Sequence, residues 1–276
     1  MTHMIYVVPS LKAKEKLQCE GKAWAESQGF AYVPRGKRTI QDLMDEYGED
    51  FLVYSSRGPQ IDRPEGSHFF SLNMAELRIQ NLRKGQRDHL LEALMGVKEY
   101  DLRPAAAQPP ISVLDCTCGF GADAAVASFG LPAGSRVDAL EVSPLLEAVT
   151  AWGFSHFVHK KDDVTAALRR ISLRCGDYHD YLLSDDGPVY DVLYFDPMFQ
   201  RPVEASCQFQ PVRAIMEHGG LTRDLIERAL QKARRRVVIK ERDFRQLCRD
   251  FPDVALYGGK YSRIGYAVLE CDSWKK

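Results

Sequence analysis

The chain contains a short stretch in which a carboxylate, a proline and an aromatic ring directly follow an apolar run. Residues 192–199 read VLYFDPMF, so Asp196, Pro197 and Phe199 stand where a buried strand should end. A carboxylate and a backbone carbonyl can together accept the hydrogens of an exocyclic amine, and proline fixes φ and removes a competing N–H. A ring two residues later can stack on the base that carries the amine. An isolated D-P-x-F is more often a plain turn, so the neighbouring motifs decide.

A second motif combines a strand end, two glycines and the start of a helix. In ISVLDCTCGFGADAAVASFG, Asp115 ends an apolar strand, and Gly119 and Gly121 follow before a helical run. Ligands of doubly wound sheets bind beyond the carboxyl ends of the strands, and glycine allows positive φ and close backbone approach. The next strand, RVDALEV, ends on Glu141, whose carboxylate can accept both hydroxyls of a ribose. These residues predict a site for a cofactor that contains a nucleoside.

Two cofactors fit this turn. Gly119, Gly121 and Ala124 match the dinucleotide pattern G-x-G-x-x-A, with Glu141 placed 20 positions after Gly121. Asp115, four residues before the first glycine, instead gives D-x-x-x-G-x-G, the arrangement of S-adenosylmethionine-dependent methyltransferases. That cofactor has no pyrophosphate for a helix N-terminus, and carboxylates and backbone groups bind its ammonium and hydroxyls. A strand-to-helix turn without any cofactor is the third interpretation.

The order of the motifs along the chain favours the methyltransferase. The strand ISLRC is followed by Gly176 and Asp177, where this architecture usually places an acidic or polar side chain on the adenine amine. The strand VLYFD then brings Asp196 to the position of the methyl acceptor. Holding donor and acceptor in line supplies most of the catalysis that such a transfer needs, and we expect no covalent intermediate.

The combined motifs resemble one family, the RsmJ family of 16S ribosomal RNA guanine-N2 methyltransferases. The family's D-A-T-A-G-L-G-x-D turn is matched by DCTCGFGAD, its L-E by LEVSP, its D-P-M-F by DPMF and its K-R-V-V-V-K by RRVVIK, within residues 68–270. Ala122 and Val142 stand where the family has an arginine and a charged residue, and both can contact cofactor through the backbone. The resemblance implies S-adenosylmethionine contacts from Ala122, Asp123, Glu141, Val142, Gly176, Asp177 and Asp196.

Basic residues gather in two stretches that fit an RNA substrate. The segment NLRKGQRDH contains Arg83, Lys84 and Arg87, and Arg78 precedes it. The segment KARRRVVIK contains, among others, Arg235 and Lys240. Each stretch alone is more readily a solvated helix face or a helix end stabilised by cations. Together, beside DPMF, they support contacts with RNA phosphates.

Composition narrows the class of protein. Of 276 residues, 45% are hydrophobic and 27% charged, which is typical of a globular protein. The 37 Lys and Arg residues against 38 Asp and Glu argue neither for nor against a polyanionic partner, so RNA contacts must be local. The seven cysteines are scattered without a second Cys/His pair at zinc spacing, which predicts reduced thiols and no metal. No apolar run is long enough for a membrane span, and we expect no membrane partner and a cytoplasmic location.

Strands and helices alternate regularly after residue 110. Apolar strand runs end near residues 116, 142, 175, 196 and 240, with helical runs between most of them. Ser143, before Pro144, and Thr222 are expected N-caps. This pattern predicts a Rossmann-like α/β class I methyltransferase fold with a mostly parallel seven-stranded sheet. The two last strand runs suggest an antiparallel addition at one edge, and we assign residues 73–276 to this domain.

The first 72 residues predict a separate, small N-terminal α/β domain. IYVVPS, FAYVPR and FLVYSSRG read as short strands, and residues 11–28 and 39–48 read as helices. The segment PQIDRPEGSHF, rich in proline and glycine, reads as a connector. The next segment, MAELRIQNLRKGQRDHLLEALMG, reads as helix broken near Gly85.

The sequence therefore favours methyl transfer from S-adenosylmethionine to an exocyclic amine of an RNA base. By resemblance, that amine is guanine N2 of small-subunit ribosomal RNA. Asp196 and the Pro197 carbonyl would orient the amine, and Phe199 would stack on the base. The alternatives are a methyltransferase acting on a small molecule or protein, a non-catalytic RNA-binding module and a dinucleotide-dependent oxidoreductase. The last of these leaves DPMF without a role.

Overall fold

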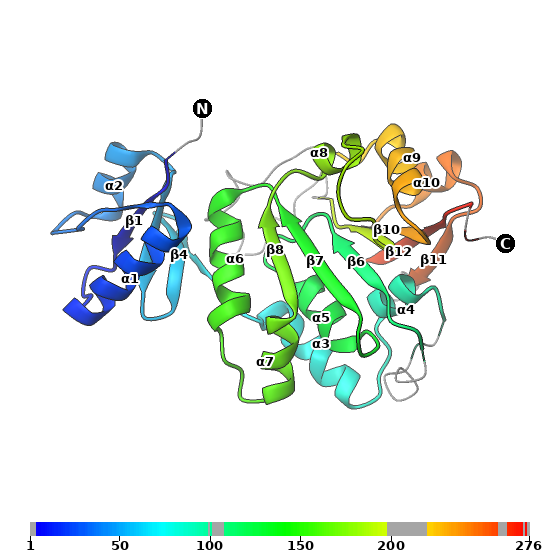
Figure 1. The fold of residues 1–276 in the computed structure, drawn as a ribbon, viewed down its shortest axis with the longest axis horizontal. Helices are drawn as coiled ribbons and strands as arrows, with labels where there is room; N and C mark the ends of the chain where they lie inside the picture. Colours follow the sequence, from blue (N-terminus) through cyan, green and yellow to red (C-terminus); the bar gives the residue numbers. More distant parts are fainter. Residues whose placement is uncertain are drawn as a thin grey trace. The chain divides into compact units, whose positions relative to one another are not determined.

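The computed structural model describes residues 4–98, 100, 108–197, 220–258, 264–272 and 274. These residues fall into two compact units. Among them, the first unit contains residues 4–71 and 143–157, and the second contains residues 72–142, 158–197 and those from 220 onward. Figure 1 shows both units in the colours of the sequence.

The second unit is built on a seven-stranded sheet with the order β11-β12-β10-β9-β6-β7-β8. The five strands from β6 to β10 pair in parallel, and β12 pairs antiparallel with both β10 and β11. The antiparallel strand thus lies one position in from the edge strand β11. This arrangement confirms the predicted Rossmann-like fold. The strands are β6 (Ser112–Asp115), β7 (Arg136–Glu141), β8 (Ile171–Cys175), β9 (Val192–Phe195), β10 (Arg236–Glu241), β11 (Ala255–Gly258) and β12 (Gly265–Glu270).

Three helices of the second unit, α4, α8 and α9, begin directly after a residue whose side chain caps the helix. The side chain of Thr222 accepts a hydrogen bond from the backbone of Leu225, and that of Asp88 accepts one from Leu90. Helices α8 and α10 were not predicted, because six residues are too few to show a helical period. The helices are α3 (Asn73–Arg83), α4 (His89–Met95), α5 (Ala122–Gly130), α7 (Asp162–Arg169), α8 (Tyr178–Leu183), α9 (Arg223–Lys232) and α10 (Arg245–Asp250).

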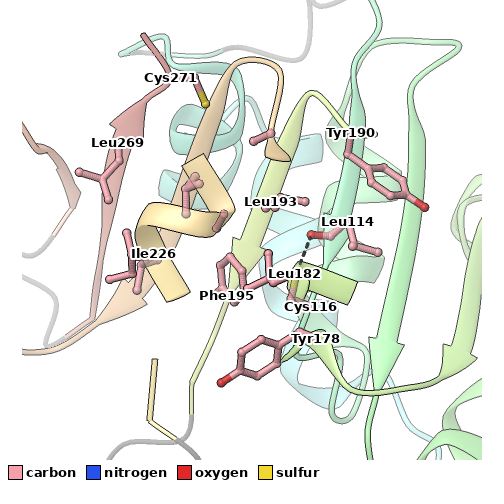
Figure 2. Packing of buried hydrophobic residues seen from close by; sticks show 14 of the residues in the cluster. Leu114, Cys116, Tyr178, Leu182, Tyr190, Leu193, Phe195, Ile226, Leu269 and Cys271 are labelled. Atoms are coloured by element: carbon pink, nitrogen blue, oxygen red, sulfur yellow. Dashed lines mark hydrogen bonds between the residues drawn. The ribbon is translucent and has the colours of Figure 1, made fainter. Parts of the chain in front are cut away.

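The two faces of the sheet carry different side chains, because successive residues of a strand point to opposite faces. Figure 2 shows Leu114, Leu193 and Phe195 on the face that packs with Leu182 of α8 and Ile226 of α9. The residues between them point to the other face, where α3, α4 and α5 pack together. The side chains of Asp115 and Tyr194 therefore lie on the side of α5.

The first unit has a five-stranded sheet with the order β2-β1-β3-β4-β5. The expected connector at residues 59–69 is wrong, because β4 and β5 form antiparallel pairs there. Pro59 is tolerated since it stands next to the start of β4, and two-residue turns join β3 to β4 and β4 to β5. The elements are β1 (Tyr6–Pro9), α1 (Glu15–Gln28), β2 (Ala31–Tyr32), α2 (Ile40–Tyr47), β3 (Phe51–Ser55), β4 (Gly58–Arg63) and β5 (Gly66–Phe69).

Helix α6 (Pro144–His156) groups with the first unit, although it lies between β7 and β8 in sequence. Its N-cap is Ser143, as predicted, and the hydroxyl accepts a hydrogen bond from the backbone of Leu146. Gly153 lets the helix approach Phe70, since a Cβ at this glycine would lie 1.9 Å from the ring. The division into domains at residues 1–72 and 73–276 stays a prediction. None of the helices that the structure describes is both long and apolar enough to cross a membrane.

Candidate functional site

The polar residues selected from the sequence end four neighbouring parallel strands. Asp115 is the last residue of β6, Glu141 is the last residue of β7, and Asp196 directly follows β9. Gly176 and Asp177 follow β8. The carboxyl ends of parallel strands meet at one edge of a sheet, which is where open α/β folds bind ligands. The structure therefore brings these residues to a common edge of the second unit.

The glycine turn after β6 has the backbone that the sequence predicted. Gly119 has a φ of 54° and Gly121 a φ of 75°, values that favour glycine. The backbone N–H of Thr117 donates to Oδ1 of Asp115 at 3.1 Å. The backbone N–H of Gly119 donates to Oε2 of Glu141 at 2.8 Å. The turn is thus tied to the carboxylates that end both β6 and β7.

This edge fits a cofactor that presents hydroxyls and an ammonium group. Ala122 begins α5 directly after the glycine turn, and Val142 follows Glu141 at the end of β7, so both can offer backbone groups at this edge. The carboxylate of Asp177 caps α8, accepting from the backbone of His179 at 2.8 Å and contacting its ring Nδ1 at 2.7 Å. The candidate cofactor residues therefore lie at the strand ends, in the turns that follow them or, for Ala122 and Asp123, in the first turn of α5. Their roles in cofactor binding stay predictions.

Asp196 is held at both its backbone and its side chain. Its backbone N–H donates to Oγ1 of Thr117 at 2.7 Å, and its Oδ2 accepts from Nζ of Lys240 at 2.6 Å. The pKa of Asp196 is raised to about 6, and burial is the largest cause. The positive charge of Lys240 lowers this pKa in part, and the negative charge of Asp123 raises it further. Pro197 follows. The third predicted residue, Phe199, lies outside the described residues.

Asp123 accepts hydrogen bonds from three side chains. Tyr194 donates its hydroxyl at 2.7 Å, Lys240 donates at 2.8 Å, and Arg78 donates to the other oxygen. Burial alone would raise the pKa of Asp123, but the charges of Lys240 and Arg78 outweigh it and lower that pKa. Asp123 is therefore an ionised carboxylate inside the protein.

Arg78 is a central residue of this cluster that the sequence showed only as part of a basic stretch. From α3 it forms two hydrogen bonds of 2.8 Å to the carboxylate of Asp88 and a further one to Asp123. Burial also raises the pKa of Asp115 well above its usual range, with the charge of Asp123 adding to the effect. No sequence signal links these residues, because their partners lie far apart along the chain.

The basic residues selected for RNA contact do not form one cluster. Arg83 pairs with Asp163, Arg87 with Glu92 and Arg235 with Asp191. Lys84 is exposed at the end of α3. Arg235 precedes β10 and Lys240 is near its end, so about 16 Å of strand separates them. Lys240 is engaged by Asp123 and Asp196, and these RNA contacts stay predictions. The predicted residues are Arg83, Lys84, Arg87, Arg235 and Lys240.

Metal binding has no support in the geometry of the site. Within the ranges that the structure describes, no group of three or more His, Cys, Asp or Glu side chains is placed to hold a metal ion. The carboxylates at the strand ends instead contact backbone N–H groups, a histidine ring and a lysine.

Comparison with known proteins gives a consistent family assignment. A family model described as "Putative SAM-dependent methyltransferase" matches residues 76–264. The chain is 28% identical to the uncharacterized protein YpiP of Bacillus subtilis over 236 residues, covering 85% of this chain and 88% of YpiP. It is 27% identical over 202 residues to ribosomal RNA small subunit methyltransferase J of Dechloromonas aromatica, covering 72% of this chain and 76% of that protein. These matches confirm the resemblance that the motifs indicated.

A solved structure supports the fold. The crystal structure of the SAM-dependent methyltransferase NGO1261 from Neisseria gonorrhoeae superposes with a TM-score of 0.62. The match covers 97% of this chain and 96% of that one, at 17% sequence identity. At this identity the likeness bears on the fold alone.

Proposed function

The chain belongs to a family of S-adenosylmethionine-dependent methyltransferases, and we propose that it methylates an exocyclic amine of a base in small-subunit ribosomal RNA. The observation that carries this proposal is the position of Asp196. It stands at the end of β9 and its backbone is hydrogen-bonded to Thr117 within the glycine turn. A carboxylate that could accept an amine is thus joined to the turn where the cofactor is expected.

The relatives support RNA as the substrate. This chain aligns with proteins from Dechloromonas aromatica and several other organisms that are named ribosomal RNA small subunit methyltransferase J. The stretch DPMF matches the RsmJ family unchanged, and that resemblance suggests guanine N2 as the acceptor. A ribosomal RNA substrate would place the protein in the cytoplasm.

The roles proposed for Asp196 and Pro197 follow from where these residues lie, and the role proposed for Phe199 rests on the sequence alone. Asp196 accepts a hydrogen bond from the amine, and the carbonyl of Pro197 accepts the second, so that the nitrogen lone pair points away from both. Phe199 stacks on the base. When bound, S-adenosylmethionine supplies an electrophilic methyl group on a positively charged sulfur. The proton that the amine loses has Asp196 as its nearest acceptor.

Cofactor binding is assigned to residues on the same edge of the sheet. Glu141 accepts hydroxyls of the ribose, and Asp177 lies beside the adenine amine. Asp115 and the backbone of the glycine turn lie where the amino-acid portion is expected. The set predicted from the sequence is Asp115, Gly119, Gly121, Ala122, Asp123, Glu141, Val142, Gly176, Asp177 and Asp196. Of these, Asp123 is not assigned to the cofactor here, because its two oxygens already accept hydrogen bonds from Arg78, Tyr194 and Lys240.

Two measurements test this function. Nucleosides of ribosomal RNA are compared by mass spectrometry between cells with and without the gene, and loss of N2-methylguanosine is expected without it. If another methylated base disappears instead, RNA methylation stands and the guanine assignment fails. Isothermal titration with S-adenosylmethionine should give saturable heat. An absence of heat and of any thermal shift would refute the methyltransferase and leave the non-catalytic RNA-binding module and the dinucleotide-dependent oxidoreductase.

A further inference from the structure

Lys240 lies in a position that phosphate contact does not explain. We propose that Lys240 is a positioning residue that fixes Oδ2 of Asp196 and leaves Oδ1 for the substrate amine, and that Asp123 anchors Lys240. This inference rests on the proposed function, because it assigns a mechanism to the same site. It gives Lys240 and Asp123 roles other than the RNA contact and the cofactor contact suggested by the sequence.

The ammonium group of Lys240 sits between two carboxylates. Its Nζ lies 2.6 Å from Oδ2 of Asp196 and 2.8 Å from Oδ2 of Asp123. The side chain is only 15% exposed. In the parallel register of β9 and β10, Ile239 pairs with Phe195, so Lys240 and Asp196 are the next residues along. Two of the three N–H groups of this ammonium therefore donate to carboxylates, which leaves at most one for a phosphate.

The two oxygens of Asp196 are not equivalent. Oδ2 accepts from Lys240, whereas Oδ1 accepts no hydrogen bond from any residue in the described ranges. The side chain is 29% exposed, so this oxygen can be reached from outside. The bond from the Asp196 backbone to Thr117 fixes the base of the side chain. An amine can therefore bind Oδ1 without displacing Lys240.

Asp123 has the contacts expected of an anchor. Arg78 donates to Oδ1, and both Tyr194 and Lys240 donate to Oδ2. Its side chain is 10% exposed. Arg78 is itself held by Asp88 through two bonds of 2.8 Å. The chain of contacts therefore runs from Arg78 of α3 through Asp123 of α5 to Lys240 of β10 and ends at Asp196. Because both oxygens of Asp123 already accept hydrogen bonds, little capacity remains for a cofactor.

The charges around Asp196 give the proposal a measurable consequence. Among the described residues, the positive charge in direct contact with Asp196 comes from Lys240, whereas Asp123, Glu241 and Asp115 add negative charge. Removal of Lys240 should therefore raise the pKa of Asp196, whereas removal of the Asp123 charge should lower it. A protonated Asp196 is a poorer acceptor for an amine. The groups that face Asp196 are Lys240 and Glu241 of β10, Asp123 of α5, Asp115 of β6 and Tyr194 of β9.

The experiment compares the full-length wild type with Lys240→Met, Lys240→Arg and Asp123→Asn. Lys232→Met is the matched control, because Lys232 is also partly buried but donates to the carbonyls of Tyr181 and Ser184 rather than to a carboxylate. The side-chain carboxyl of Asp196 is titrated by carbon-13 NMR, with its signal assigned from its loss in Asp196→Asn. The same proteins are assayed for kcat against pH, for RNA affinity and for S-adenosylmethionine affinity.

We expect Lys240→Met to raise the titration midpoint of Asp196 by about 1 pH unit or more and to lower kcat at neutral pH at least ~10-fold. Lys240→Arg should bring the midpoint back towards that of the wild type. Asp123→Asn should move it in the opposite direction, so it tests the coupling even if Lys240→Met does not fold. S-adenosylmethionine affinity should change less than about 3-fold in Lys240→Met, and Lys232→Met should leave the titration midpoint of Asp196 where it is in the wild type.

Two outcomes overturn the proposal. One is a titration midpoint of Asp196 that stays the same in folded Lys240→Met and in Asp123→Asn. The other is a loss of salt-dependent RNA affinity in Lys240→Met with kcat unchanged at saturating RNA, which is the signature of a phosphate contact. A wild-type protein that methylates no RNA would refute the proposed function instead, while the titration would still decide the coupling of Lys240 to Asp196.

Discussion

The backbone N–H of Gly119 donates a hydrogen bond of 2.8 Å to the carboxylate of Glu141. The bond joins the turn after β6 to the end of β7, the two places where a nucleoside cofactor is expected. Glu141 is 7% exposed, so the carboxylate is held within the protein while it remains beside the turn.

Replacement of Glu141 by Gln should therefore weaken S-adenosylmethionine binding about 10- to 100-fold. The amide keeps one oxygen for the Gly119 N–H but loses the charge that strengthens hydrogen bonds from ribose hydroxyls. Titration calorimetry measures the affinity, and Glu227→Gln on the exposed face of α9 serves as the control. Unchanged affinity in the Glu141 variant would remove the ribose contact from the proposal.

Replacement of Asp196 by Ala should abolish methyl transfer while cofactor binding largely survives. The reason is that the amine loses its acceptor, whereas the glycine turn and Glu141 remain in place. Transfer is measured with radiolabelled S-adenosylmethionine and ribosomal RNA, and a fall of at least ~1000-fold is expected. Asp185→Ala, at an exposed position, is the control. Full activity of the Asp196 variant would contradict the proposed mechanism.

The pH dependence of the reaction should show an acidic limb close to the pKa of Asp196, about 6 in the free protein. Below this value Asp196 takes up a proton and becomes a poorer acceptor, so kcat/KM falls as the pH falls. Steady-state assays between pH 5 and 8 would locate the limb, and its absence in that interval would contradict an essential ionised Asp196.

The same raised pKa affects folding stability with a defined sign. Between the ordinary Asp value of 3.8 and about 6, the folded protein binds a proton at Asp196 that the unfolded chain does not. This group therefore makes the free energy of unfolding decrease as the pH rises through that window. Asp196→Asn should flatten this part of the stability curve in urea titrations. An identical slope in the variant would show that Asp196 does not titrate there.

Two arginines of α3 should differ sharply in their contributions to stability. Arg78→Met leaves Asp88 and Asp123 without their shared partner in a buried setting and should cost about 2–4 kcal/mol. Arg83→Met is the matched control, since Arg83 pairs with an exposed Asp163 and should cost about 1 kcal/mol or less. Chemical denaturation measures both values. Equal costs would mean that the contacts of Arg78 do not act as a buried network.

Lys84 is the candidate RNA contact that is best exposed for this role. It has no ion pair with the described residues, unlike Arg83, Arg87 and Arg235. Lys84→Ala should weaken RNA binding and lower the slope of log affinity against log salt by about 0.7–0.9, the value of one phosphate contact. Filter binding at several salt concentrations measures the slope. An unchanged slope would exclude Lys84 from the RNA interface.

Local rules were enough to predict the main fold and the strand-end residues. Alternating strands and helices imply a parallel sheet, and a parallel sheet brings strand ends to one edge. For this reason Asp115, Glu141 and Asp196 could be assigned to one edge from the sequence. The glycine turn was also predictable, since Gly119 and Gly121 supply the positive φ that it requires.

Pairing between distant residues was not predictable. Lys240 contacts Asp123 across 117 positions of the chain, and Arg78 contacts the same aspartate across 45. The sequence showed both only as basic residues in basic stretches, and of the two it assigned Lys240 to RNA contact. The pairs arise only when β10, α3 and α5 pack together.

What the sequence determined by itself was therefore the order of the elements and the edge of the sheet that carries the chemistry, because both follow from short-range patterns. What only the tertiary structure decided was the partner of each buried charge. A charge taken from water needs an opposite charge or a hydrogen-bond donor within a few ångströms, and only the packed fold determines which groups come that close. The same reason explains why Lys240, assigned to RNA from the sequence, lies between Asp123 and Asp196.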